Sequence, residues 1–307
     1  MPTESGPSLS QMRGKRLALA ALALAASLLG GCQFSRMSGA RAESSRQWSQ
    51  QAAAAMENGH WQQAESLLQQ AVQSNPEDSV ARGRLAQALW QRGERQAAIA
   101  QLEGARQLAP HDSELTLQAA GLYLEVNDFE RARRAAEQVI DREPRSARGW
   151  ILRGQAWQAS GDPNRALADF QRGLQYAPND RFALEQISGL YRTLHQPQRS
   201  LSSLQALAAT YPPREEPAEL FFAQGLAYQA LGRHEDAADR LRLAAERGPP
   251  NADVWCALGE AELAAGYPDR AHEVALRALA LVPDHAEARR LVDRVVAAAP
   301  ATANLRR

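Results

Sequence analysis

The spacing of the prolines constrains the fold of this chain more than any other feature of its sequence. Five prolines follow one another at intervals of 34 residues, and after three extra residues two more resume the same interval. They are Pro76, Pro110, Pro144, Pro178 and Pro212, then Pro249 and Pro283. A fixed period of this length indicates a repeat protein, in which small units stack on their neighbours.

Aligning the blocks on their prolines reveals two columns of small residues. The first holds Ala64, Ala98, Ala132, Ala166, Ala237 and Ala271, with Ser200 as its exception. The second holds Ala52, Ala86, Ala120, Gly154, Ser188, Gly225 and Gly259. Two helices that cross closely need small side chains where their backbones meet. The columns therefore predict a pair of closely packed helices in each block.

A third column predicts where the two helices of each block are joined. It holds Gly59, Gly93, Gly161, Gly232 and Gly266, and Asn127 is the substitute in the third block. Glycine ends a helix at low cost because it adopts the left-handed region. Pro163, Pro197 and Pro268 then fall in the first turn of the second helix, and we expect Asp162 to cap one such helix.

A fourth column has a large residue early in the first helix, and its best examples are Trp48, Trp150, Phe221 and Trp255. Together the four columns resemble those of the tetratricopeptide repeat. The resemblance implies an all-α solenoid of about seven helix-turn-helix repeats spanning residues 45–285. The repeats are 45–78, 79–112, 113–146, 147–180, 181–214, 218–251 and 252–285. Residues 286–299 have no second helix after them and are expected to form a capping helix, with Leu291 and Val295 on the apolar end of the stack. We expect a disordered tail over 300–307.

The fifth block departs most from this pattern. It has Ser188, His195, Pro197 and Ser200 in columns that are otherwise small or turn-forming, and three extra residues follow it. Two interpretations are open, namely a bend in the stack or a longer surface loop. We favour the loop, because solenoids tolerate insertions there.

The N-terminal segment has the order of a secretory signal peptide, predicted over residues 1–31. Arg13, Lys15 and Arg16 precede an apolar run from Leu17 to Leu29. Its thirteen residues are well short of the roughly 20 that cross a bilayer, which disfavours a permanent membrane helix. Because the first eleven residues are polar, Met12 is an alternative true start.

The run ends in Leu29-Gly30-Gly31-Cys32, which resembles the lipobox of bacterial lipoproteins. By that resemblance Cys32 carries a diacylglyceryl group and becomes the mature N-terminus. Two acyl chains make a stable anchor where one is marginal. Residues 32–44 are then expected to form a flexible tether. Gln33 after the cysteine favours, by the same resemblance, the outer membrane, with the repeats facing the periplasm.

Charge and chemistry exclude several classes of function. Thirty-five basic residues balance 35 acidic ones, which disfavours nucleic acid as a partner. No nucleophile motif, glycine-rich phosphate loop or metal-ligand spacing is present, so we predict no enzyme activity, no catalytic residue, no cofactor, no metal and no small-molecule substrate. Cys256 is expected to be a small apolar filler rather than a nucleophile.

The resemblance places function on the concave surface lined by the first helices. The residues that the packing columns leave free there are Trp90, Leu117, Leu124 and Ile151, with Gln87, Gln118 and Gln155 between them. They suit a peptide or helix of a partner protein, and the competing interpretation is that they pack as core. The family's lysine and asparagine clamp for a C-terminal carboxylate is not matched, since no lysine lies in any repeat.

We therefore predict a non-enzymatic scaffold or adaptor of the bacterial cell envelope. The whole resembles outer-membrane tetratricopeptide-repeat lipoproteins, and this resemblance implies a role in the assembly of pili, secretion channels or polysaccharide exporters. Two alternatives are an accessory subunit of an envelope hydrolase or protease and a purely structural spacer.

Overall fold

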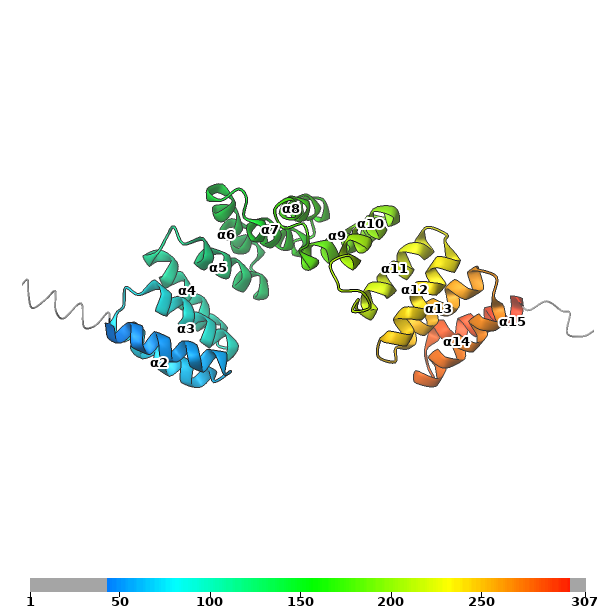
Figure 1. Ribbon diagram of the computed structural model, residues 1–307, viewed down its shortest axis with the longest axis horizontal. Helices are drawn as coiled ribbons and strands as arrows, with labels where there is room; N and C mark the ends of the chain where they lie inside the picture. Colours follow the sequence, from blue (N-terminus) through cyan, green and yellow to red (C-terminus); the bar gives the residue numbers. More distant parts are fainter. Residues whose placement is uncertain (1–42, 299–307) are drawn as a thin grey trace, which may run out of the picture. The chain divides into compact units, whose positions relative to one another are not determined.

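The computed structural model describes residues 43–298, and this part of the chain consists of helices without strands (Figure 1). A helix over residues 43–57 comes first. It is followed by α2 (Trp61–Ser74), α3 (Ser79–Gln91), α4 (Arg95–Leu108), α5 (Ser113–Glu125), α6 (Phe129–Arg142), α7 (Ala147–Ala159) and α8 (Pro163–Tyr176). The remaining helices are α9 (Arg181–Thr193), α10 (Pro197–Ala208), α11 (Ala218–Ala230), α12 (His234–Arg247), α13 (Ala252–Ala264), α14 (Pro268–Leu281) and α15 (Ala286–Ala298).

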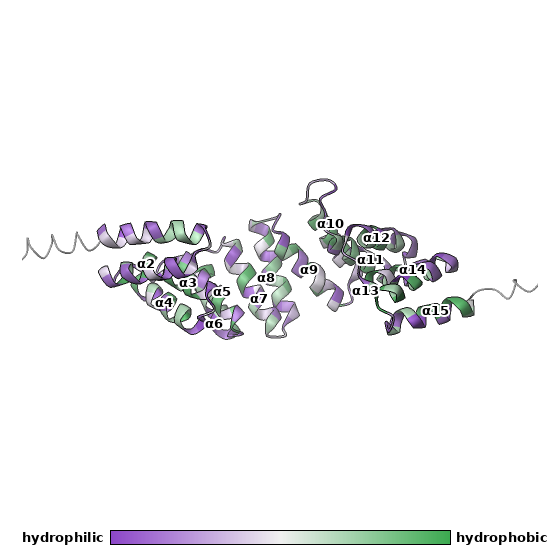
Figure 2. Ribbon diagram, turned by 90° about the horizontal axis from the view of Figure 1, so that it is seen from below, coloured by the Kyte–Doolittle hydropathy of each residue, from purple (hydrophilic) through white to green (hydrophobic). Residues whose placement is uncertain are grey.

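The helices form two compact units that divide within α5, after Leu122. In the first unit α3 packs against α2 and α4, and in the second each helix from α6 to α15 packs against its neighbours in sequence. Hydrophilic and hydrophobic residues both occur along each helix (Figure 2), and buried apolar side chains form clusters that join neighbouring helices. The fold is the predicted all-α solenoid of paired helices with a C-terminal capping helix.

The small residues lie where the sequence columns place them. All six alanines of the first column are fully buried, and Ser200 is buried as well. In the second column, a β-carbon on Gly225 would lie 2.5 Å from Leu241 Cγ, and one on Gly259 would lie 2.5 Å from Leu291 Cδ2. These positions are glycine because the neighbouring leucines occupy the space that a side chain would need.

The turns within the pairs also follow the sequence. The five glycines of the turn column have φ between 71° and 88°, and Asn127 takes the same left-handed conformation at 60°. His195 fills this place in the fifth block at φ 54°, which is uncommon for a residue with a β-carbon. Asp162 caps α8 as expected, because its Oδ1 accepts the Arg165 N–H at 3.0 Å.

The three extra residues of the chain lie in the connection between α10 and α11. This connection contains Arg214 at φ 73°, and Glu216 Oε2 lies 3.4 Å from an Arg247 guanidinium nitrogen. Helices α10 and α11 still pack against each other across it. The insertion therefore lengthens a loop without separating the two repeats that it joins.

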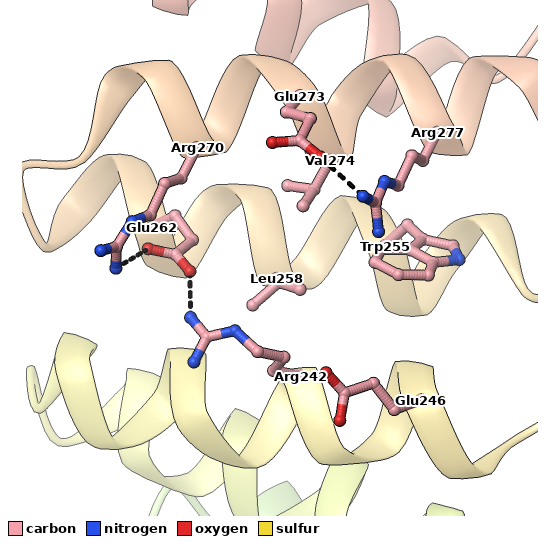
Figure 3. Close-up of a pocket in the computed structure, with 9 residues that line it drawn as sticks. All are labelled: Arg242, Glu246, Trp255, Leu258, Glu262, Arg270, Glu273, Val274 and Arg277. Atoms are coloured by element: carbon pink, nitrogen blue, oxygen red, sulfur yellow. Dashed lines mark hydrogen bonds and ion pairs between the residues drawn. The ribbon is translucent and has the colours of Figure 1, made fainter.

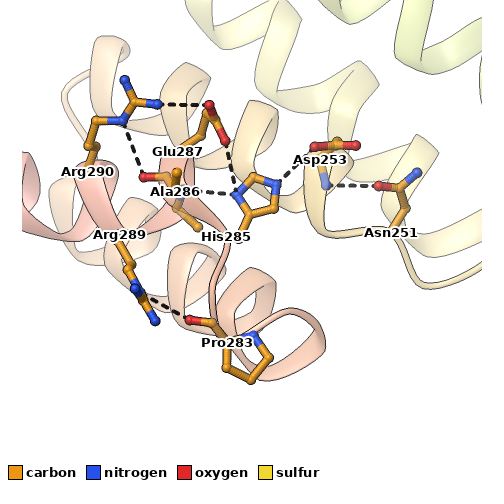
Figure 4. Close-up of polar contacts among 9 residues, drawn as sticks. Asn251, Asp253, Pro283, His285, Ala286, Glu287, Arg289 and Arg290 are labelled. Atoms are coloured by element: carbon orange, nitrogen blue, oxygen red, sulfur yellow. Dashed lines mark hydrogen bonds and ion pairs between the residues drawn. The ribbon is translucent and has the colours of Figure 1, made fainter.

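The capping helix is held by packing and by a histidine. Leu291 and Ala288 are fully buried, and Val295 nearly so, in a cluster with Cys256, Ala271, Ala275 and Ala278. His285 Nδ1 accepts the Ala288 N–H at 3.1 Å, so Nε2 carries the proton that it donates to Asp253 Oδ1 at 2.9 Å (Figure 4). One imidazole thus caps α15 and ties it to α13.

Candidate functional site

A cleft of about 400 Å³ opens around α9 in the second unit, and we call it the α9 cleft. Most of its lining comes from the first helices of three successive repeats, α7, α9 and α11, and α10 contributes the rest. The lining residues are Gln158, Glu185, Gln186, Ser188, Gly189, Arg192, Thr193, Ser200, Leu204, Glu219, Phe222 and Ala223. Its volume falls in the range of pockets that bind ligands.

The residues of α9 and α10 beneath the cleft are small. Ser188 and Ser200 are buried, and their hydroxyl groups donate to the carbonyl oxygens of Glu185 at 2.7 Å and Ser188 at 2.9 Å. A β-carbon built on Gly189 would have no neighbour within 4 Å. Gly189 therefore leaves space above the helix that a larger residue would occupy without a clash.

Charged groups in the α9 cleft are available for a ligand. Glu185, Arg192 and Glu219 are all exposed, and the charged group of none of them has a hydrogen bond or ion pair within residues 43–298. Gln158 donates to Gln186 Oε1 at 3.0 Å and links α7 to α9. Phe222 is half-buried and supplies an apolar surface. Such a mixture suits a polypeptide segment, which has both charged and apolar side chains.

The predicted groove residues of the first unit have different environments. Gln87 is exposed, and Gln118 is half-buried and donates to Glu114 Oε1 at 3.2 Å. Trp90 is half-buried, packs against a core cluster that includes Leu68 and Leu89, and has the Arg95 guanidinium 5.8 Å from its ring centre. Leu117 is only 6% exposed. Leu117 is therefore a core residue, and its placement on an open surface is wrong.

In the second unit, Leu124 and Gln155 are half-buried, whereas Ile151 is buried with Ala166 and Phe170. A β-carbon on Gly173 would lie 2.8 Å from Ile151 Cγ1. Ile151 thus fills the space left by Gly173 on the partner helix α8, and its assignment to an open groove is corrected. Roles of Gln87, Trp90, Gln118, Leu124 and Gln155 in partner binding remain predictions.

The sequence did contain a signal for the α9 cleft. Ser188 and Ser200 lie in the block that departs most from the repeat pattern, and the sequence alone relates this departure to a bend or a longer loop. Gly189, the next residue of the same helix, has no side chain where the fourth and sixth repeats have Gln155 and Leu226. No pattern in the sequence distinguishes Glu185, Arg192 or Glu219 from the other exposed charges of the repeats.

Groups with catalytic or metal-binding potential are sparse in the described part of the chain. Residues 43–298 contain no group of three or more histidine, cysteine, aspartate or glutamate side chains that could hold a metal ion. Cys256 is buried, and burial, with nearby Glu260, Glu287 and Asp253, raises the pKa of its thiol to about 11. At neutral pH Cys256 is therefore a weak nucleophile.

The predicted signal peptide, the predicted lipidation site Cys32 and the predicted C-terminal tail lie outside the described residues. Among the helices of residues 43–298, none is long and apolar enough to span a bilayer.

Comparison with known proteins agrees with the repeat pattern. A family model described as a tetratricopeptide repeat matches residues 55–105 and 89–156, and a second one matches residues 147–180. "Cellulose synthase operon protein C" of Escherichia coli K12 is 38% identical over 103 residues, which cover 29% of this chain and 9% of that protein. The chain thus matches only about a tenth of this relative's length.

Solved structures show the same fold. A tetratricopeptide repeat protein from Parabacteroides merdae has a TM-score of 0.58 at 17% identity, over 83% of this chain and 99% of its own. Pseudomonas aeruginosa pilF has a TM-score of 0.52 at 16% identity, with the same coverage. YrrB, described as having an unusual peptide-binding site, has a TM-score of 0.57 at 20% identity over 62% and 96%. The chain is a tetratricopeptide-repeat protein.

Proposed function

We propose that this protein is a non-enzymatic adaptor of the bacterial cell envelope that binds a segment of a partner protein in the α9 cleft. The observation that carries the proposal is an open cleft with unpaired Glu185, Arg192 and Glu219 around a surface glycine, Gly189. Exposed charges of both signs beside Phe222 provide specificity and apolar contact together.

A substitution that fills the cleft without damaging the fold tests this proposal. Gly189→Leu adds a side chain into open space, and replacing a helical glycine with leucine favours the helix by up to about 1 kcal/mol. We expect the variant to melt no lower than the wild type and to capture envelope partners at least tenfold less in a pull-down from detergent-solubilised membranes. Ala168→Leu, at an exposed position of α8, is the matched control and should capture them normally.

Undiminished capture by Gly189→Leu would remove the α9 cleft from the proposal. If no substitution in the α9 cleft changes partner capture or phenotype, the result supports the alternative that the protein is a purely structural spacer. Hydrolysis of envelope substrates by the purified repeat domain would instead support the accessory-enzyme alternative and count against an adaptor.

The envelope location in this proposal rests on the N-terminal sequence. We propose that Cys32 is lipidated and holds the repeats at the periplasmic face of the outer membrane. Cys32→Ala should abolish fatty-acid labelling and release the protein from membrane fractions or leave an uncleaved precursor. Unchanged labelling would contradict lipidation, and fractionation with the inner membrane would contradict the location.

The machine that the adaptor serves is proposed as a class. Assembly of pili, secretion channels or polysaccharide exporters fits an anchored repeat protein, and two likenesses point the same way. One is the fold shared with pilF, and the other is the local similarity to the cellulose synthase operon protein. Identification of the proteins that wild type and Ala168→Leu retain, but Gly189→Leu loses, would choose among these machines.

A further inference from the structure

A second cavity, of about 440 Å³, lies between α12, α13 and α14, and we call it the Glu262 pocket (Figure 3). Arg242 and Glu246 project from α12, and Trp255, Leu258 and Glu262 lie on α13. Helix α14 contributes Arg270, Glu273, Val274 and Arg277. None of these residues belongs to the α9 cleft, so the two sites are separate surfaces of the second unit.

The Glu262 pocket lies where the seventh repeat lacks the aromatic ring of repeats three to six. At the eleventh position of repeats three to six the chain has Tyr123, Trp157, Tyr191 and Tyr228. The seventh repeat has Glu262 at this position, and the residue is only 2% exposed. The side chain of Glu262 is smaller than these rings, so the space that a ring fills in repeats three to six is left open.

The groups that surround the ring elsewhere are retained here. In the fifth repeat the Tyr191 hydroxyl accepts a hydrogen bond from Gln171 Nε2 of the preceding helix at 2.7 Å. Arg242 occupies the position of Gln171 in the sixth repeat, and it donates to Glu262 in the same way. The nineteenth residue of repeats three, four and five is an arginine whose guanidinium group lies over the ring of the same repeat. The guanidinium carbon lies 4.7 Å from the ring centre for Arg131 and Tyr123, 4.6 Å for Arg165 and Trp157, and 5.8 Å for Arg199 and Tyr191. Arg270 is the arginine of this position in the seventh repeat.

Glu262 also has an unused hydrogen-bond acceptor. Its Oε1 is bonded by Arg242, whereas its buried Oε2 has no hydrogen bond, and the nearest Arg270 nitrogen is 3.9 Å away. A buried acceptor without a donor is unfavourable, which makes a donor from outside a natural partner. The pocket therefore offers a space for a ring, an arginine face and an acceptor.

The charges of the pocket select the kind of donor. Arg242, Arg270 and Arg277 would repel a cation, and Glu246, Glu262 and Glu273 would repel an anion. A neutral group avoids both penalties. We propose that the Glu262 pocket receives a tyrosine side chain of a partner protein, whose hydroxyl donates to Glu262 Oε2 and whose ring lies against Arg270, Leu258 and Val274.

Binding of small analogues to the wild-type protein tests the chemistry. The probes are 4-methylphenol and 4-methylanisole, which share a ring but differ in the donor, and binding is followed by NMR shifts of the residues in the pocket. We expect saturable shifts with 4-methylphenol and at least tenfold weaker binding of 4-methylanisole. Equal affinities, or no saturable shift at these residues, would overturn the proposal.

A second pair of probes tests whether the ligand is a protein side chain. N-acetyltyrosinamide should shift the same residues and compete with 4-methylphenol, whereas N-acetylphenylalaninamide should bind at least tenfold less tightly. If 4-methylphenol binds but N-acetyltyrosinamide does not, the pocket is a site for small phenols and the proposed protein partner is wrong.

A variant that restores the ring completes the test. Glu262→Tyr places a tyrosine where repeats three, five and six have one, so we expect it to fold and to lose binding of both phenolic probes. Asp269→Asn, at an exposed position of α14 that does not line the pocket, is the matched control and should keep the preference for 4-methylphenol over 4-methylanisole. Unchanged binding by a folded Glu262→Tyr would place the phenol elsewhere, and if this variant does not fold the wild-type comparisons decide alone.

Discussion

The thiol of Cys256 illustrates how burial sets chemistry at a single residue. Its pKa is raised from 9.0 to about 11, so at pH 8 about a hundredfold less thiolate is present than in an unperturbed cysteine. We expect native protein to react with a thiol reagent at least tenfold more slowly than protein unfolded in urea, as measured by the absorbance of released thionitrobenzoate. Equal rates would contradict the burial of this thiol.

The same shift predicts how stability depends on pH. Folding favours the neutral thiol, so the unfolded chain ionises first when the pH rises above 9.0. The free energy of unfolding should then fall between pH 9.0 and about 11. In Cys256→Ala this component should be absent, and urea denaturation at several pH values measures the difference.

Trp90 is a residue for which the sequence left two interpretations open. It is half-buried and packs against Leu68 and Leu89, so part of its surface already belongs to the core. If Trp90 were fully buried, Trp90→Ala would lower the free energy of unfolding by roughly 3–5 kcal/mol. Because it is half-buried, we expect a loss of about 2 kcal/mol. Urea denaturation checks this, and a pull-down of the same variant tests whether binding falls beyond its unfolded fraction.

At the residue scale, the sequence predicts packing better than binding. Ala166 and Gly93 each belong to a column of seven equivalent positions. Because the same residue type recurs in a column, the column reveals what packing or turn conformation that position requires. Glu262 stands alone, because its importance is that it differs from the aromatic residues of repeats three to six, and Gly189 stands at a position that varies from repeat to repeat. Ile151 was misplaced since its burial depends on Gly173, 22 residues away on the facing helix.

At the scale of a helix pair, the first small column can be tested for tolerance to bulk. Ala166 is fully buried beside Ile151 and Phe170, so Ala166→Leu should cost about 1–3 kcal/mol through overpacking. Ala168→Leu, two residues along α8 and exposed, should cost far less. Thermal melting of the two variants measures the difference, and equal melting temperatures would mean that the register of α8 is wrong.

The element boundaries were readable because the turns use residues with known conformational preferences. Left-handed Gly59 or Asn127 ends a first helix, and Asp162 begins a second. The capping role of His285 was not predicted, since histidine is a less usual cap than aspartate or serine. His285 can act as a cap because Asp253 of α13 accepts the proton on Nε2, which leaves Nδ1 free to accept the Ala288 N–H.

At the scale of the whole molecule, the 34-residue period determines the fold because every repeat meets the same packing requirement at its neighbours. Function does not repeat in this way. The Glu262 pocket lies where the seventh repeat departs from the aromatic residue of repeats three to six, and the α9 cleft lies over the serines of the fifth repeat. A search for departures from the columns would therefore have found both cavities, whereas a search for residues outside the columns led to Leu117 and Ile151.

The capping helix provides the last prediction, because a solenoid transmits damage only between neighbours. Removal of residues 286–307 exposes the surface that Leu291 and Val295 cover, and roughly 1.5–3 kcal/mol for each of these side chains predicts a loss of about 3–6 kcal/mol. Hydrogen exchange should accelerate mainly in α13 and α14 while α7 and α8 keep their protection. A chain that ends at Ala298 retains α15 and should behave as the wild type. A uniform loss of protection from α7 to α14 would instead mean that the second unit unfolds as one cooperative body, and that nearest-neighbour coupling does not describe it.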